Sequence, residues 1–141
     1  MKYYTSNYNP EYNVANVWVQ HLGHIFNGAA HTHPQEENPS EFVGCEIAER
    51  RAVIKALKYE RNLAKENLKK YQDFVKACEC YKDWNKEDPS AKIVYRQLNR
   101  RIKQVNDLTE EIKNCEDLLK RYIVTREVLK KRLKEKKEKS K

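Results

Sequence analysis

A seven-residue repeat of apolar residues over positions 94–133 limits the fold of this chain more than any other feature of its sequence. Ten of the twelve repeat positions are apolar. One position of the repeat holds Leu98, Val105, Ile112, Leu119, Arg126 and Leu133, and the other holds Val94, Arg101, Leu108, Cys115, Tyr122 and Leu129. Such a repeat predicts a long α-helix that supercoils against a partner helix.

A weaker repeat of the same period precedes it over residues 47–78, and it predicts a second long helix. This first helix begins at Asn38-Pro39-Ser40-Glu41, where either Asn38 or Ser40 is the N-cap. A polar segment at 82–88 follows, and Asp88-Pro89 is a strong signal for the start of the later helix. Because the link is short, we expect the two helices to pack antiparallel.

The segment before the helices differs in composition, since it holds all four histidines, Trp18 and four tyrosines. Val14–Gln20 and His24–Phe26 are rich in β-forming residues, and His21–Gly23 between them is a predicted turn. The sequence therefore predicts an aromatic, histidine-rich β element over residues 1–38 and a helical hairpin over 39–141. The predicted fold class is mainly α: a coiled-coil-like pair of antiparallel helices with a short N-terminal β-hairpin. Because two helices leave part of so wide an apolar stripe uncovered, we also expect a homodimer.

Composition and motifs argue against several classes of function. No apolar run approaches the roughly 20 residues that a membrane span needs, and the start of the chain has no signal-peptide pattern. The four cysteines form no C-x-x-C pair, which favours free thiols in a reducing cytoplasm. No nucleotide-loop, hydrolase or zinc-binding motif occurs, so we expect no catalytic residue, no metal site and no cofactor.

Arginine at a repeat position is the sharpest functional signal, because a charge in a helix seam is costly unless it is paired or meets a ligand. Arg50, Arg61, Arg101 and Arg126 occupy such positions. Two interpretations stay open: glutamates of the facing helix pair with them, or the helices open around an anion that guanidinium groups bind. The predicted ligand-binding set is these four arginines together with Tyr122 and Trp18.

The end of the chain is strongly basic. Residues 120–141 hold 11 basic and 3 acidic side chains, a net charge of +8 that equals the net charge of the whole chain. Such a tail favours salt-dependent binding of nucleic acid as an alternative function, although a solvated helix end has the same composition. The residues predicted for that alternative are Lys130, Lys131, Arg132, Lys134, Lys136 and Lys137.

The layout of Val14–Phe26, the helix start Gly44-Cys-Glu-Ile-Ala-Glu-Arg-Arg51 and the arginines along residues 96–126 resemble the anti-Thoeris sponge proteins of phages. The resemblance implies a phage-encoded anti-defence protein that sequesters a cyclic ADP-ribose-type signal in pockets of a dimer. We therefore expect a non-enzymatic binding protein of the cytoplasm, which sequesters an anionic nucleotide or blocks a host protein. A structural coiled-coil adaptor is the remaining alternative.

Overall fold

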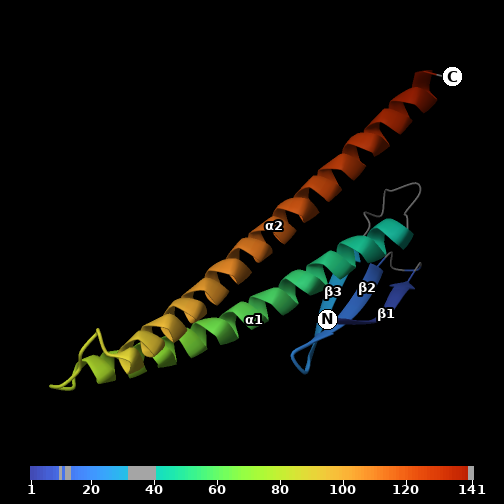
Figure 1. The fold of residues 1–141 in the computed structure, drawn as a ribbon. Helices are drawn as coiled ribbons and strands as arrows, with labels where there is room; N and C mark the ends of the chain where they lie inside the picture. Colours follow the sequence, from blue (N-terminus) through green and yellow to red (C-terminus); the bar gives the residue numbers. More distant parts are fainter. Residues whose placement is uncertain (10, 12–13, 32–40, 140–141) are drawn as a thin grey trace. The chain divides into compact units, whose positions relative to one another are not determined.

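The computed structural model describes residues 1–9, 11, 14–31 and 41–139. In chain order they form the strands β1 (Lys2–Asn9), β2 (Val14–His21) and β3 (His24–His31) and the helices α1 (Glu41–Glu79) and α2 (Pro89–Lys139) (Figure 1). The chain divides into two compact units, of which unit 1 comprises Met1–Ala56 with Lys113–Lys141 and unit 2 comprises Leu57–Ile112. Each helix therefore contributes residues to both units.

The strands of unit 1 form one antiparallel sheet in the order β1-β2-β3, with β2 in the middle. The pairing of β1 with β2 shifts register between Tyr4 and Ser6, which marks a β-bulge in β1. β2 and β3 are joined by the predicted turn, where Leu22 has φ 52° and Gly23 has φ 77°. Positive φ at both central residues matches the twist of a two-residue hairpin.

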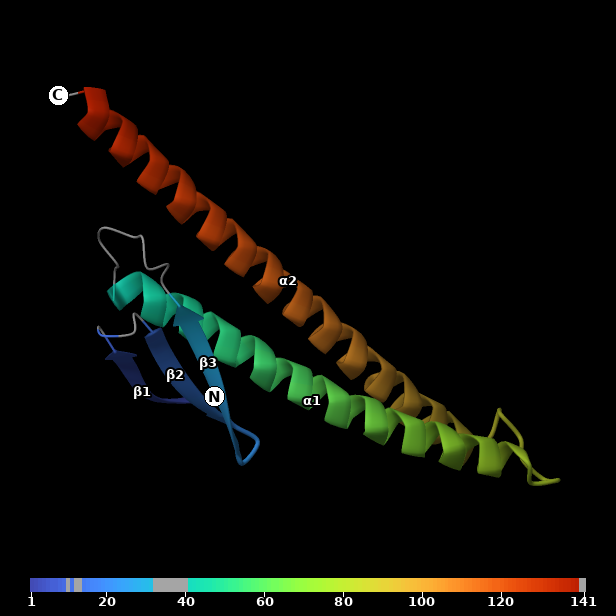
Figure 2. The ribbon, with the colours of Figure 1, turned by 180° about the vertical axis from the view of Figure 1, so that it is seen from behind.

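Figure 2 shows one face of the sheet against the first part of α1. Small side chains make this contact. Ala48, Ala52 and Ala56 follow at intervals of four residues along the helix, and each is completely buried. They meet Val17, Val19 and Ala30 of the sheet, and Gly28 of β3 lies directly against the backbone of α1 at Ala48 and Ala52. The absence of bulk on both sides lets helix and sheet approach closely.

The β part of the predicted fold class is wrong. The sequence predicted a two-stranded hairpin, and the structure has a sheet of three strands because Lys2–Asn9 pairs with the second edge of β2. β1 contains no aliphatic residue, so the alternation of apolar and polar residues gave no strand signal there. Its tyrosines and threonine nevertheless suit a pleated strand, and a lone hairpin would have been only marginally stable.

Both predicted helices are present, and α2 begins at Pro89 as its start signal indicated. In unit 2 the two helices run antiparallel and side by side (Figures 1 and 2). Their buried residues are largely those of the repeats: Leu57, Ala64, Val75, Ala91, Leu108 and Ile112. The predicted boundary at residues 38 and 39 lies outside the described residues, and the predicted dimer concerns a second chain; both stay predictions.

Leu129 and Leu133 are repeat residues that the structure leaves exposed, at 44% and 62% of their surface. Glu46, near the start of α1, contacts Tyr122 of α2. Because the helices run in opposite directions, the part of α2 after Tyr122 extends toward and past the start of α1. Over the described part of the chain, no helix is long and apolar enough to cross a membrane.

Candidate anion-binding groove

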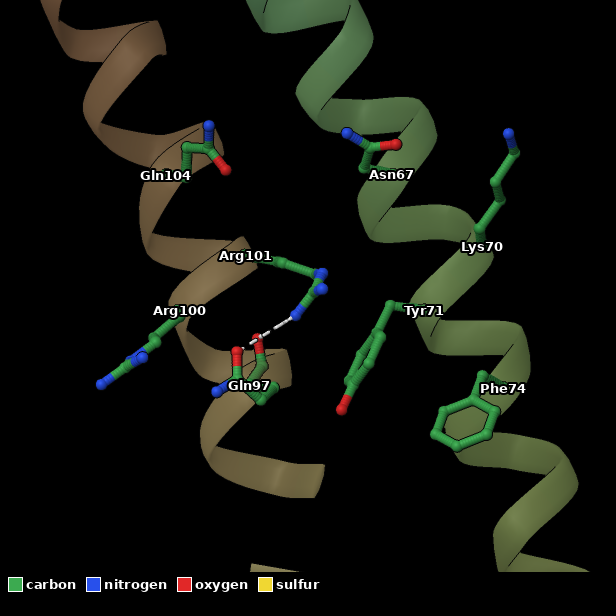
Figure 3. Close-up of a pocket in the computed structure, with 8 residues that line it drawn as sticks. All are labelled: Asn67, Lys70, Tyr71, Phe74, Gln97, Arg100, Arg101 and Gln104. Carbon is green, nitrogen blue, oxygen red and sulfur yellow. Dashed lines mark hydrogen bonds between the residues drawn. The ribbon is translucent and has the colours of Figure 1, made fainter. Parts of the chain in front are cut away.

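An open groove of about 590 Å³ lies between α1 and α2 in unit 2, and we call it the Arg101 groove (Figure 3). Its walls come from one face of each helix: Asn67, Lys70, Tyr71 and Phe74 of α1, and Gln97, Arg100, Arg101 and Gln104 of α2. Three of these side chains are cationic, three are amides, two are aromatic and none is a carboxylate. The composition suits an anion with a planar part, because amides and cations donate hydrogen bonds while rings offer faces for stacking.

Arg101 lies at the centre of the groove and is held there by neutral groups. Its guanidinium carbon lies 4.1 Å from the centre of the Tyr71 ring. Its Nη1 donates to the backbone oxygen of Gln97 at 3.1 Å and to the Oε1 of that residue at 3.5 Å. Among the described residues no carboxylate forms an ion pair with Arg101, so the guanidinium keeps its attraction for an external anion.

Tyr71 is itself fixed, because its hydroxyl donates to the backbone oxygen of Val94 at 3.2 Å. Phe74 lies beside Tyr71 with ring centres 5.5 Å apart, and it is 51% exposed. In Figure 3 Arg101 reaches across the gap between the helices, while Lys70 and Arg100 extend outward at its rims. The groove thus combines one preorganised cation, an exposed ring and two cations at the edges.

A second hollow of about 360 Å³ adjoins the groove and shares Arg100 and Gln104 with it. Here Glu60, Asp107 and Glu111 accompany Lys103. The charge of this face of unit 2 therefore changes from positive at Arg101 to mixed beyond Arg100.

Three other predicted ligand residues meet around a carboxylate in unit 1, forming what we call the Tyr122 cluster: Glu46, Arg50, Tyr122 and Arg126. The Tyr122 hydroxyl donates to Glu46 Oε2 at 2.7 Å, and Arg50 Nη2 donates to Glu46 Oε1 at 3.3 Å. The guanidinium groups of Arg50 and Arg126 lie 5.3 and 5.4 Å from the centre of the Tyr122 ring.

The Glu46 carboxylate is hydrogen-bonded within the Tyr122 cluster, whereas the Nε of Arg50 is buried with no hydrogen-bond partner among the described residues. The hydrogen bond from Tyr122, aided by Arg50, lowers the pKa of Glu46 despite some desolvation. Burial, followed by the bond to the Glu46 carboxylate, raises the pKa of Tyr122. The Glu46 carboxylate accepts hydrogen bonds from Arg50 of its own helix and from Tyr122 of α2, so the cluster connects α1 to α2 in unit 1.

The remaining predicted residues lie elsewhere. Arg61 is half-buried on α1 in unit 2, and its Nε is buried with no hydrogen-bond partner among the described residues. Trp18 is half-buried on β2, where it pairs with Tyr4 and Asn27 on the face of the sheet opposite α1. Of the six predicted ligand residues, Arg101 alone lines the groove.

Sequence reasoning missed Tyr71, Lys70 and Gln97 as groove residues. A signal for Tyr71 existed, because it is a bulky aromatic at a repeat position of α1, as Arg101 is a charge at a repeat position of α2. Tyr71 and Arg101 face each other because of how the antiparallel helices are aligned. No local sequence pattern specifies that alignment. Lys70 and Gln97 carry no comparable signal, since they lie outside the repeat.

The basic tail is helical to Lys139. Lys131, Arg132, Lys134, Lys136 and Lys137 are all exposed, while the side chain of Lys130 lies outside the described residues. In the described ranges, no group of three or more histidine, cysteine, aspartate or glutamate side chains could hold a metal ion.

Comparison of the chain with models of protein families, with curated proteins and with solved structures found no match.

Proposed function

We propose that this chain is a non-catalytic binding protein that captures an anionic, nucleotide-type small molecule in the Arg101 groove. The observation that carries the proposal is the guanidinium of Arg101, stacked on Tyr71 and bonded to Gln97 in a groove whose walls contain no carboxylate. Both hydrogen bonds leave from Nη1, so Nε and Nη2 can donate to phosphate oxygens.

A nucleotide fits this groove better than inorganic phosphate does. Arg100 and Lys70 at the rims supply charge for a second anionic group, and the exposed Phe74 ring supplies a face on which a base can stack. The amides of Asn67, Gln97 and Gln104 match ribose hydroxyls and base edges, which both donate and accept. Each component of a nucleotide thus has a counterpart in the groove.

The groove is built from one chain, so this binding needs no dimer. The resemblance to the anti-Thoeris sponges makes a cyclic ADP-ribose-type signal the first ligand to try, and sequestration in the cytoplasm of a phage host the proposed setting. Blocking of a host protein is the second form of the proposal, and the same groove would then receive a phosphate or carboxylate of that protein.

The test is isothermal titration calorimetry with a panel of cyclic ADP-ribose, ADP-ribose, nucleoside mono- and diphosphates, ribose 5-phosphate and inorganic phosphate. Arg101→Ala should weaken binding of the best ligand by about ten- to a hundredfold, because hydrogen bonds to charged groups contribute roughly 1.5–3 kcal/mol. Arg96→Ala is the matched control: it removes an exposed arginine of the same helix that does not line the groove. Binding by no ligand of the panel, or equal effects of the two variants, would contradict the proposal.

The basic tail supports a second candidate function, the binding of nucleic acid. Its described side chains are exposed, as phosphate contact requires. Deletion of residues 130–141 should abolish binding to a mixed-sequence DNA duplex and leave the affinity of the groove for nucleotides unchanged. Duplex binding that survives the deletion, or that does not weaken with added salt, would refute this candidate.

A further inference from the structure

The two edge strands of the sheet differ in how far the rest of unit 1 covers them. β3 is one edge strand, and α1 covers its outward backbone: Arg51 Nη1 donates to the oxygen of Ala29 and Lys55 Nζ donates to the oxygen of Asn27, both at 2.8 Å. These bonds use carbonyl groups that another strand would need, which is a common way to protect a sheet edge. β1 is the other edge strand, and among the described residues no strand pairs with its outer side.

The sequence of β1 is close to self-complementary. If two copies of this strand pair antiparallel with Ser6 opposite Ser6, and Thr5 is the extra residue of the bulge, Tyr3 of one copy lies opposite Tyr8 of the other, and this pair occurs twice. Tyr3 pairs with Val19 and Tyr8 pairs with Ala15. Because Val19 and Ala15 are buried on the α1 face of the sheet, both tyrosines lie on that face.

The bulge explains why these tyrosines share a face although they are five residues apart. An uninterrupted strand would place residues an odd number apart on opposite faces. The extra residue between Tyr4 and Ser6 brings Tyr3 onto the same face as Tyr8. A two-fold axis places the same bulge on both strands, so each strand has the same number of residues between its two tyrosines. The bulge would disfavour pairing of β1 with most other strands, but it is compatible with pairing to the β1 of a second copy of the chain.

Charge also favours self-pairing. Lys2 is the single charged side chain of β1, and this register places it opposite Asn9 rather than opposite another lysine. Tyr3 is 57% exposed in the single chain, so pairing would cover a large aromatic surface. We propose that the outer edge of β1 is a homodimerisation site, at which two copies join their three-stranded sheets into one six-stranded sheet. Because strand pairing of this length is a small interface, we expect a weak dimer.

Sedimentation velocity over a wide range of protein concentration tests the proposal, together with site-resolved amide hydrogen exchange. We expect a monomer–dimer equilibrium and slower exchange of β1 amides as concentration rises, with no change in α2. Tyr3→Lys should raise the dimer dissociation constant roughly tenfold or more, because it removes two tyrosine pairs and adds two charges. Ile25→Lys is the control: it replaces an apolar residue on β3 that is 65% exposed, and should leave dimerisation unchanged.

Circular dichroism of both variants checks that the fold persists. A monomer at every concentration would overturn the proposal, and so would a dimer that Tyr3→Lys leaves intact with β1 exchange independent of concentration. The latter result would assign the interface to the helices. Protection of β1 that appears only with an added extended peptide would assign the edge to a different partner. None of these outcomes bears on nucleotide binding, since the Arg101 groove lies within one chain.

Discussion

Replacing Gly28 by alanine should destabilise unit 1 more than the same replacement at either of its other described glycines, Gly23 and Gly44. A Cβ at this position would overlap the backbone oxygen of Ala48 and lie 2.5 Å from the backbone nitrogen of Ala52. Carbon needs about 3.5 Å or more for a favourable contact. The atoms in conflict are helix backbone rather than the end of a flexible side chain, so α1 must move away from the sheet by about an ångström.

Such a movement would loosen the contacts of both buried clusters, because Ala48 and Ala52 belong to them. Overpacking of a core typically costs about 1–3 kcal/mol and occasionally more. We expect the upper end here, about 3 kcal/mol of the unfolding free energy, because separating α1 from the sheet affects every contact along the alanine stripe.

Chemical denaturation followed by tryptophan fluorescence measures this loss. The chain has two tryptophans, Trp18 in unit 1 and Trp84 in unit 2, so a Trp84→Phe background reports on unit 1 alone. Gly44→Ala is the matched control, since its added Cβ would lie 3.2 Å from the Ala15 Cβ and the alanine gains up to about 1 kcal/mol of helix propensity. We expect that variant to change stability by less than about 1 kcal/mol. A Gly28→Ala protein as stable as the Gly44→Ala protein would refute the close helix–sheet packing.

Two further predictions concern the aromatic contacts of the two units. Because the pKa of Glu46 is lowered on folding from its ordinary 4.5, its contribution to the stability of unit 1 should be full above about pH 4.5 and lost as pH falls through the lowered value. Because the pKa of Tyr122 is raised above its ordinary 10.0, its contribution should be present below pH 10 and lost at higher pH. Tyr122→Phe should flatten both dependences in denaturation curves recorded by Trp18 fluorescence, and an unchanged pH profile would contradict the role of the hydrogen bond. Tyr71→Leu should lower the unfolding free energy of unit 2 by about 1 kcal/mol, the usual size of a cation–π contact, as measured by Trp84 fluorescence in a Trp18→Phe background. The same variant should also weaken nucleotide binding. A variant that binds nucleotide as tightly as the parent protein would show that the contact between Arg101 and Tyr71 is dispensable.

The helices could be predicted because their signals are local. The repeat at 94–133 and the Asp88-Pro89 start each involve residues within one or two turns of one another, and the start of α2 agrees with them. β1 could not be predicted in this way, since Lys2–Asn9 becomes a strand by pairing with a neighbour rather than by an apolar pattern of its own.

The sequence also showed, by itself, that arginines stand at repeat positions, where a charge needs a partner. It could not show which partner each one has. Arg50 shares Glu46 with Tyr122, a residue 76 positions away from that carboxylate, whereas Arg101 stacks on Tyr71 and faces an open groove. The choice between a paired arginine and an arginine free to bind an anion depends on how residues distant in the chain are aligned across the two helices. Periodicity specifies which face of a helix is buried, but only the tertiary structure decides what that face meets.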